Sequence, residues 1–211
     1  VVPGYFAADG DAANTGARAG NKWRAHLVPY APGEWTWSAS FRKGFKIAVN
    51  DYAMAGEPCS FDGATGSFTV EASDKTAPDF RAKGMLQYVG EHYLQFAGSK
   101  DYFLKGGPNS PETFLGYAEF DGTWDRGGVP LPALENGLRT YPAHIKDWQA
   151  GDPTWMDGKG KGIIGALNYI GSQGMNVVYF LTMNLQGDGD DVWPWMDPWT
   201  HYNFDVSKLA Q

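Results

Sequence analysis

Three tryptophans gather near the carboxyl end of the chain, in the stretch DDVWPWMDPWTHY. They are Trp193, Trp195 and Trp199, and His201 follows them. A flat aromatic face suits the apolar face of a pyranose ring, while neighbouring carboxylates can bind its hydroxyl groups. We therefore take Trp193, Trp195 and His201 as candidate substrate-binding residues. The alternative is that these side chains only pack as a lid or rim over other elements.

Polar side chains also follow two apolar runs of the sequence. Asn184 comes just after the second run, where its amide would offer a hydrogen-bond donor and an acceptor to a hydroxyl group, or would cap the loop. Asn109 and Glu112 come just after the first run, and we take both as ligand candidates. Between them, Ser110 and Pro111 have the types expected at the N-cap and first position of a helix.

Acidic residues crowd together in the segment GDGDD, which contains Asp188, Asp190 and Asp191. Such a cluster can bind Ca2+, but the spacing does not complete an EF-hand loop, so a solvated acidic turn is favoured. The four histidines have no metal-binding spacing, and we predict no metal centre. The sequence contains no phosphate-binding loop, dinucleotide glycine motif or nucleophile elbow, and no cofactor is predicted.

Composition narrows the class of protein. The chain has 211 residues and a net charge of -7, which argues against nucleic acid as a partner. No apolar run is long enough to cross a bilayer, so no membrane span is predicted. The single cysteine, Cys59, cannot form a disulfide within the chain. Aromatic residues make up 15% of the sequence and include 9 tryptophans, which indicates a surface able to stack on flat or ring-shaped partners.

The first part of the chain has the pattern of short strands. Two stretches within residues 21–41 alternate apolar and polar residues on either side of the turn APGEW, which predicts a half-buried antiparallel pair. Residues 45–49 and 67–72 add further candidate strands. This pattern favours an immunoglobulin-like β-sandwich over residues 1–72. It is a partial one, because about four strands are present where such a sandwich uses about seven.

The second part begins after a polar segment, residues 73–84, which we interpret as a linker. Residues 85–105 then predict strand, turn, strand, turn and strand, the last of them over residues 102–105. The long segment 106–161 has little periodicity, so it is either functional or contains short helices that the pattern does not reveal.

A helix and a buried strand follow. Ile163, Leu167 and Ile170 recur at helical spacing, which predicts a helix over residues 163–173 with Gly174 just beyond its end. Residues 177–182 form a continuous apolar run, typical of a strand covered on both faces. Strand, helix and strand in this order predict a βαβ unit and a parallel sheet.

Several phrases of the sequence resemble one bacterial family. They are GNKWRAHLVPYAPGEWTWSASFRKG, YFLKGGPNSPETFLGYAEFDGT, DWQAGDPTWMDGKGKGIIGALNYIGSQGMNVVYFLTMN and VWPW…FDVSKL. Together they cover nearly the whole chain, and they are similar to proteins with a DUF5060 domain. In that family an immunoglobulin-like sandwich precedes a (β/α)8 barrel of glycoside-hydrolase type. The resemblance implies an exported bacterial protein, secreted, periplasmic or at the cell surface, that processes a polysaccharide or oligosaccharide.

The resemblance also implies a fold for each part. A partial immunoglobulin-like β-sandwich, residues 1–72, is followed by the linker and by the first βαβ part of a (β/α)8 TIM-type barrel, residues 85–211. The loops after strands 102–105 and 177–182 would then line the mouth of the substrate pocket, because barrel enzymes build their sites there.

The catalytic residues are expected elsewhere. Barrels of the common retaining clan carry their two catalytic carboxylates after strands 4 and 7, and this mapping reaches only strand 2. We therefore expect a fragment that supplies subsites and that has the remainder of the same polypeptide as a partner. The alternatives are a self-contained domain, a non-catalytic carbohydrate-binding protein, or a structural protein of the cell surface.

Overall fold

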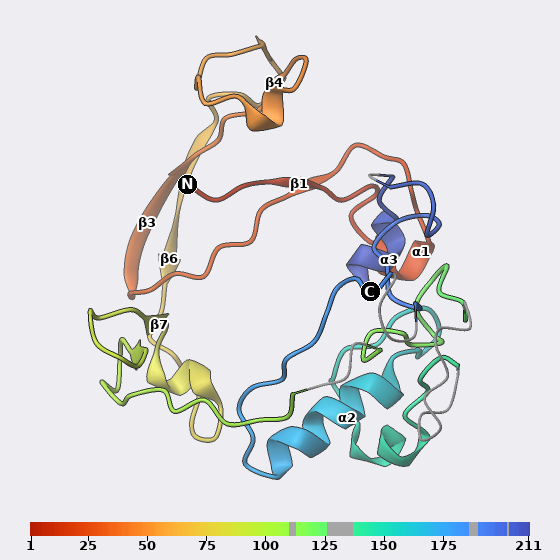
Figure 1. Cartoon of the computed structure of the whole chain (residues 1–211). Helices are drawn as coiled ribbons and strands as arrows, with labels where there is room; N and C mark the ends of the chain where they lie inside the picture. Colours follow the sequence, from red (N-terminus) through yellow and green to blue (C-terminus); the bar gives the residue numbers. More distant parts are fainter. Residues whose placement is uncertain (110–112, 126–136, 186–189, 202) are drawn as a thin grey trace. The chain divides into compact units, whose positions relative to one another are not determined.

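A computed structural model describes residues 1–109, 113–125, 137–185, 190–201 and 203–211 of the chain (Figure 1). The chain divides into two compact units. The helical unit consists of Val1–His26 together with Lys105–Gln211, and the strand-rich unit consists of Leu27–Leu104. These units do not coincide with the segments 1–72, 73–84 and 85–211 expected from the sequence, and those boundaries stay predictions.

The elements are short. The strands are β1 Tyr5–Phe6, β2 Trp23–Arg24, β3 Gly33–Ser38, β4 Arg42–Lys43, β5 Glu57–Pro58, β6 Thr65–Val70, β7 Leu86–Gln87 and β8 Gln95–Phe96. The α-helices are α1 Ala12–Thr15, α2 Lys161–Ser172 and α3 Val206–Ala210, and the 3-10 helices are η1 Ile47–Val49, η2 Phe80–Lys83 and η3 Pro142–Asp147. Within the described residues the strands form two-stranded sheets and no closed barrel. The sandwich and the barrel therefore stay predictions.

The longest strand pair lies in the strand-rich unit. β3 runs antiparallel to β6, with Trp35 opposite Phe68 and Trp37 opposite Gly66. A Cβ atom at Gly66 would lie 2.7 Å from the Trp37 ring, so the indole lies directly over the glycine. This aromatic and glycine pairing fixes the register of the two strands.

Two expectations for this region are wrong. The strand at 33–38 does not pair with residues 23–27, because β6 offers it a partner for all six residues, whereas β2 pairs with β1 in the other unit. Residues 45–49 do not form a strand. Lys46 has a φ of 51°, a left-handed conformation that interrupts an extended chain, and Ile47–Val49 forms η1 instead.

The meander expected over residues 85–105 is confirmed in outline. β7 pairs with β8 in antiparallel fashion, and Gln95 forms an antiparallel bridge with Tyr102. The segment interpreted as a linker contains η2, whose first turn is held by the side chain of Asp79 accepting from the N–H of Arg81.

The helix predicted over residues 163–173 is confirmed as α2. Gly174 has a φ of 77°, its N–H donates to the carbonyl of Gly171, and the N–H of Met175 donates to the carbonyl of Ile170. These two bonds are those of a Schellman motif, so Gly174 ends the helix as the sequence predicts. Another helix of the helical unit, α3, begins just after Asp205, whose side chain caps it.

A parallel contact joins the segments on either side of α2. Asn109 forms a parallel bridge with Tyr179. The backbone N–H of Asn176 donates to the carbonyl of Gly106 at 2.8 Å, and the backbone N–H of Tyr179 donates to the carbonyl of Pro108 at 3.4 Å. This is an isolated bridge, because neither residues 106–109 nor residues 177–182 form a strand in the described part of the chain, and Tyr179 and Phe180 are exposed where a covered strand was expected. The βαβ unit therefore stays a prediction. The first segment is residues 106–109 rather than 102–105, because Tyr102 pairs with Gln95.

The core of the helical unit is aromatic. Phe114, Tyr117, Trp155 and Ile163 are buried in contact with one another. The stacked rings of Phe120 and Trp155 lie 5.2 Å apart and extend this cluster toward the surface. Ile163 contributes the inner face of α2, so the cluster ties the helix to the loops that precede it.

We predict that Gly107→Ala destabilises the helical unit. A Cβ atom at Gly107 would lie 1.6 Å from the carbonyl oxygen of Val177, so the parallel contact must open. We expect a loss of about 2–3 kcal/mol in the free energy of unfolding. The measurement is urea unfolding followed by circular dichroism.

Gly171→Ala is the matched control. A Cβ atom at Gly171, inside α2, has no neighbouring atom within 4 Å. This variant should gain about 0.5–1 kcal/mol, because alanine favours a helix. Equal stability of the two variants would contradict the parallel contact.

Candidate functional site

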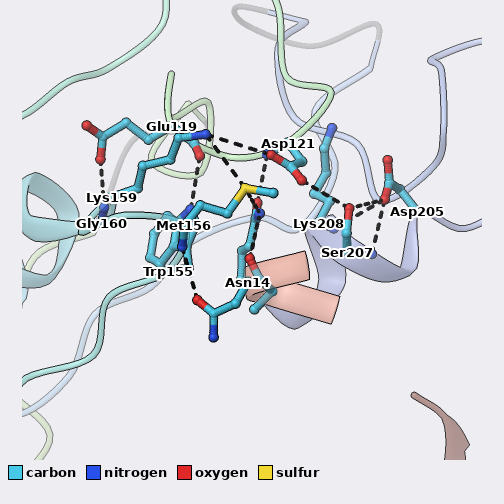
Figure 2. A network of polar contacts seen from close by, with 12 residues as sticks. Asn14, Glu119, Asp121, Trp155, Met156, Lys159, Gly160, Asp205, Ser207 and Lys208 are labelled. Atoms are coloured by element: carbon cyan, nitrogen blue, oxygen red, sulfur yellow. Dashed lines mark hydrogen bonds and ion pairs between the residues drawn. The ribbon is translucent and has the colours of Figure 1, made fainter. Parts of the chain in front are cut away.

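Polar groups from four parts of the helical unit meet in one network (Figure 2). They come from the N-terminal segment around α1, the loop after Tyr117, the turn before α2, and α3. We call this set the polar network, and its members are Asn14, Glu119, Asp121, Trp155, Met156, Lys159, Gly160, Asp205, Ser207 and Lys208.

Glu119 lies at the start of α2. Its Oε2 atom accepts from the hydroxyl of Tyr117 at 2.5 Å and from the N–H of Gly160 at 2.6 Å. Its backbone carbonyl accepts from the indole N–H of Trp155 at 3.0 Å. A carboxylate at a helix N-terminus is also favoured by the helix dipole. Glu119 therefore positions α2 against the aromatic core.

Gly160, the N-cap of α2, is needed for this packing. Its φ of 93° is left-handed, and a Cβ atom there would lie 2.2 Å from the Trp155 ring. Only a glycine lets the ring of Trp155 cover the first turn of the helix.

Two tyrosines of the core have raised pKa values. Burial is the main cause for Tyr117, and its contact with Glu119 raises the pKa further. Burial raises the pKa of Tyr141 from 10.0 to about 12, and its hydroxyl donates to the carbonyl of Phe114 at 2.9 Å. Both phenols are thus held as neutral hydrogen-bond donors.

Asp205 is fully buried, with 0% of its surface exposed. Its carboxylate caps α3 by accepting from the N–H groups of Ser207 and Lys208, each at 3.2 Å, and from the Ser207 hydroxyl at 3.0 Å. The guanidinium of Arg18 lies 3.3 Å from its other oxygen. The buried charge is therefore both paired and hydrogen-bonded, as burial requires.

Asp121 links α3 to the neighbouring loops. Its carboxylate accepts from the Ser207 hydroxyl at 3.2 Å and lies 4.0 Å from the Lys159 amine. Its backbone N–H donates to the side-chain oxygen of Gln211 at 2.7 Å. The N-terminal segment joins the same network, because the N–H of Met156 donates to Asn14 Oδ1 at 3.0 Å.

Lys208 has an unusual environment for a lysine. Burial lowers the pKa of its amine from 10.5 to about 8, although the charges of Asp205 and Asp121 act in the opposite direction. The amine lies 4.6 Å from the centre of the Trp193 ring and 3.5 Å from the Trp193 carbonyl oxygen. At neutral pH this amine therefore loses its proton far more readily than an exposed lysine.

The structure places the predicted tryptophans in different surroundings. Trp193 is only 2% exposed, and its ring packs edge-on against Trp124 with 5.4 Å between ring centres. Trp195 is partly buried and lies against His201, with 4.7 Å between ring centres. The indole N–H groups of Trp193 and Trp195 have no hydrogen-bond partner among the described residues. The sugar-binding role of all three residues stays a prediction.

The two predicted asparagines lie in different surroundings. Asn184 is buried, its side-chain oxygen accepts from the N–H of Val192 at 2.8 Å, and its own N–H donates to the carbonyl of Val192. These bonds give Asn184 the loop-capping role, which is one of the two roles expected for it. Asn109 is exposed on its parallel bridge to Tyr179. Glu112 lies outside the described residues.

The acidic segment gives no further sign of a metal site. Asp188 lies outside the described residues, Asp190 has a left-handed φ of 53°, and Asp191 is buried. In the part of the chain that the structure describes, no three His, Cys, Asp or Glu side chains are grouped so that they could hold a metal ion.

Sequence reasoning missed the residues that make the polar network. The signal for Asp205 was present, since an aspartate directly before the VSK segment is a typical N-cap. The roles of Glu119 and Lys208 had no local signal, because both depend on contacts between residues that are distant in sequence.

Comparisons with protein-family models, with curated proteins and with solved structures find no match to this chain. In the described ranges, none of the helices has the length and apolar character needed to cross a bilayer.

We predict that Glu119 and Tyr117 are energetically coupled. Glu119→Ala leaves the donors at Tyr117 and Gly160 without their acceptor, so it should cost about 2–3 kcal/mol of unfolding free energy. Tyr117→Phe should cost about 1 kcal/mol. Measured by urea unfolding, the double variant should cost less than the sum of the two by about 1 kcal/mol. Strict additivity would show that the Tyr117–Glu119 bond contributes nothing.

Tyr141 makes the free energy of unfolding depend on pH in the alkaline range. Its pKa is 10.0 in the unfolded chain and about 12 in the fold, so the unfolded chain releases the proton first. The stabilisation is therefore complete below pH 10 and is lost as the pH rises toward about 12. The unfolding free energy of the wild-type chain should fall more steeply over this range than that of Tyr141→Phe. Parallel pH profiles would contradict the assignment.

Proposed function

We propose that the chain is part of an exported glycoside hydrolase and supplies carbohydrate subsites to it. The proposal comes from the family resemblance of the sequence and is supported by one observation, the parallel bridge between Asn109 and Tyr179 on either side of α2. Parallel strands joined by a helix have their carboxyl ends at one edge of a sheet. In barrel enzymes the loops at that edge hold the substrate.

The aromatic side chains provide further support. Trp199 is 72% exposed, and Trp195 forms a partly buried pair with His201. An exposed indole and an aromatic pair within one short segment, residues 195–201, can offer a platform for a sugar ring, because the apolar face of a pyranose packs on an aromatic ring while its hydroxyl groups stay in water.

The carboxylates of the polar network favour a binding role over bond cleavage by this chain. Glycoside hydrolysis needs two carboxyl groups that face a shared space on either side of the scissile bond. Glu119, Asp121 and Asp205 are instead occupied by hydrogen bonds that position α2 and α3. We propose that the catalytic pair comes from another part of the same polypeptide.

Affinity electrophoresis tests the proposal. The purified chain is run through native gels that contain one neutral polysaccharide each, and its mobility is compared with that in a gel without polysaccharide. We expect retardation by at least one polysaccharide. Trp195→Ala should weaken the affinity about tenfold, which corresponds to the loss of one stacking contact of about 1.4 kcal/mol.

Tyr88→Ala is the control. Tyr88 is an exposed aromatic residue of the strand-rich unit, and its removal should leave the retardation unchanged. No retardation by any polysaccharide would contradict a carbohydrate-binding role. Release of reducing sugar by the purified chain would contradict the proposal that the catalytic carboxylates come from elsewhere.

A further inference from the structure

The loop between β4 and β5 exposes an unusual amount of apolar surface (Figure 1). We call residues 44–56 the apolar loop. Four of its large side chains are mostly exposed: Phe45 by 90%, Val49 by 79%, Tyr52 by 69% and Met54 by 61%. Single exposed apolar residues are ordinary on a protein surface, but a group of this size in one short loop indicates an interaction site.

A buried guanidinium holds the apolar loop closed. Arg42, at the base of the loop, donates to three successive carbonyls, those of residues 54–56, at 2.8 to 3.2 Å. Asp62 lies 2.7 Å from another nitrogen of the same guanidinium, and the two side chains are only 11% and 15% exposed. The loop thus has a polar pair inside and apolar side chains outside, the reverse of the usual arrangement in a loop that faces water.

The base of the apolar loop is tight. A Cβ atom at Gly44 would lie 3.3 Å from the Cα atom of Gly56, and Gly56 itself has a left-handed φ of 71°. Within the loop, the N–H of Tyr52 donates to the side-chain oxygen of Asn50 at 2.9 Å, and the N–H of Ala55 donates to the carbonyl of Tyr52 at 2.9 Å. A loop held in this way loses little conformational entropy when it binds a partner.

We propose that the apolar loop is the surface at which two copies of this chain associate about a two-fold axis. In such an interface the same surface serves both copies, so it must be complementary to itself. The inference rests on the contacts of the strand-rich unit and does not depend on the proposed carbohydrate function.

The exposed apolar area matches what a dimer needs. With about 200 Å² for an aromatic side chain, Phe45 and Tyr52 together expose about 320 Å². Val49 and Met54 raise the total to about 500 Å² for each copy. A standard interface buries about 800 Å² on each partner, of which about 60% is apolar, or about 500 Å². The loop therefore supplies the apolar centre of an interface, and its surroundings supply the polar rim.

The charges of the apolar loop are also complementary to themselves. Its only charged residues, Lys46 and Asp51, are both exposed, and in the described chain neither has an oppositely charged group within 4.0 Å. A two-fold axis can pair the lysine of each copy with the aspartate of the other. A lipid bilayer is a poorer partner, because the carboxylate between Val49 and Tyr52 would enter it without a counter-charge.

Sedimentation velocity of the whole chain, at concentrations from about 1 to about 200 µM, tests the proposal. We expect the mass to rise with concentration from 23.1 kDa toward twice that value. Phe45→Ala should raise the Kd of the dimer about 30-fold, because a two-fold interface loses each contact twice. Since Phe45 is 90% exposed, the variant should keep the circular dichroism spectrum of the wild-type chain.

Tyr88→Ala is the matched control for this measurement. Tyr88 is an aromatic residue of the same unit, is 76% exposed and lies outside the apolar loop. Its removal should change the Kd of the dimer by less than about twofold.

Charge reversal tests the two-fold pairing. Lys46→Glu and Asp51→Lys should each raise the Kd about tenfold, because each places like charges opposite one another. The double variant should return to the wild-type Kd, which a general loss of loop structure would not produce.

Three results would overturn the proposal. They are a wild-type chain that stays monomeric over the whole concentration range, a dimer whose Kd is the same in Phe45→Ala, and a double charge variant that associates no better than the single ones. Co-sedimentation of a monomeric chain with phosphatidylcholine vesicles would also contradict it, and would assign the loop to a lipid surface.

Discussion

The helical unit depends on the hydrogen bonds that the carboxylate of Glu119 accepts. This carboxylate accepts both from the hydroxyl of the core residue Tyr117 and from the first N–H of the turn that begins α2. A partly buried carboxylate is stabilised by the donors around it, and here the donors belong to the two elements that must meet. The aromatic cluster of Phe114, Tyr117, Trp155 and Ile163 then packs around a helix whose start is already fixed.

Asp205 has a comparable role at the other end of the chain. It stabilises α3, a helix too short to form by itself, and it attracts Arg18 from the N-terminal segment. The same helix contributes Ser207 and Lys208, so one buried carboxylate positions a hydroxyl and an amine toward Asp121 and Trp193. The unusual environment of Lys208 follows from this arrangement.

The sequence predicted the features that depend on local pattern. The apolar stripe of Ile163, Leu167 and Ile170 gave α2, and Gly174 ended it, because helix periodicity and capping are encoded within a few residues. The strand pairing of residues 33–38 was predicted wrongly. Several segments with a similar alternating pattern compete as partners, and only the tertiary fit of Trp37 over Gly66 selects β6.

The candidate site was less predictable for the same reason. Trp193 and Trp195 were chosen by residue type, which says nothing of burial, and the structure buries Trp193 beneath Lys208. Glu119 stood in an irregular stretch without periodicity, so its pairing with Gly160 left no trace in the pattern. Contacts across such a distance in sequence require the fold to be known.

The division of the chain has a consequence for how it folds. The helical unit is discontinuous, because the whole of Leu27–Leu104 separates its N-terminal segment from the rest. The contacts of Asn14 with Met156 and of Arg18 with Asp205 therefore close a very long loop, whose entropy cost grows only slowly with length but whose closure is slow. During synthesis, residues 1–26 emerge long before α3 exists. Asn14 cannot dock until Met156 has been made, and Arg18 cannot pair with Asp205 until the last part of the helical unit has been made.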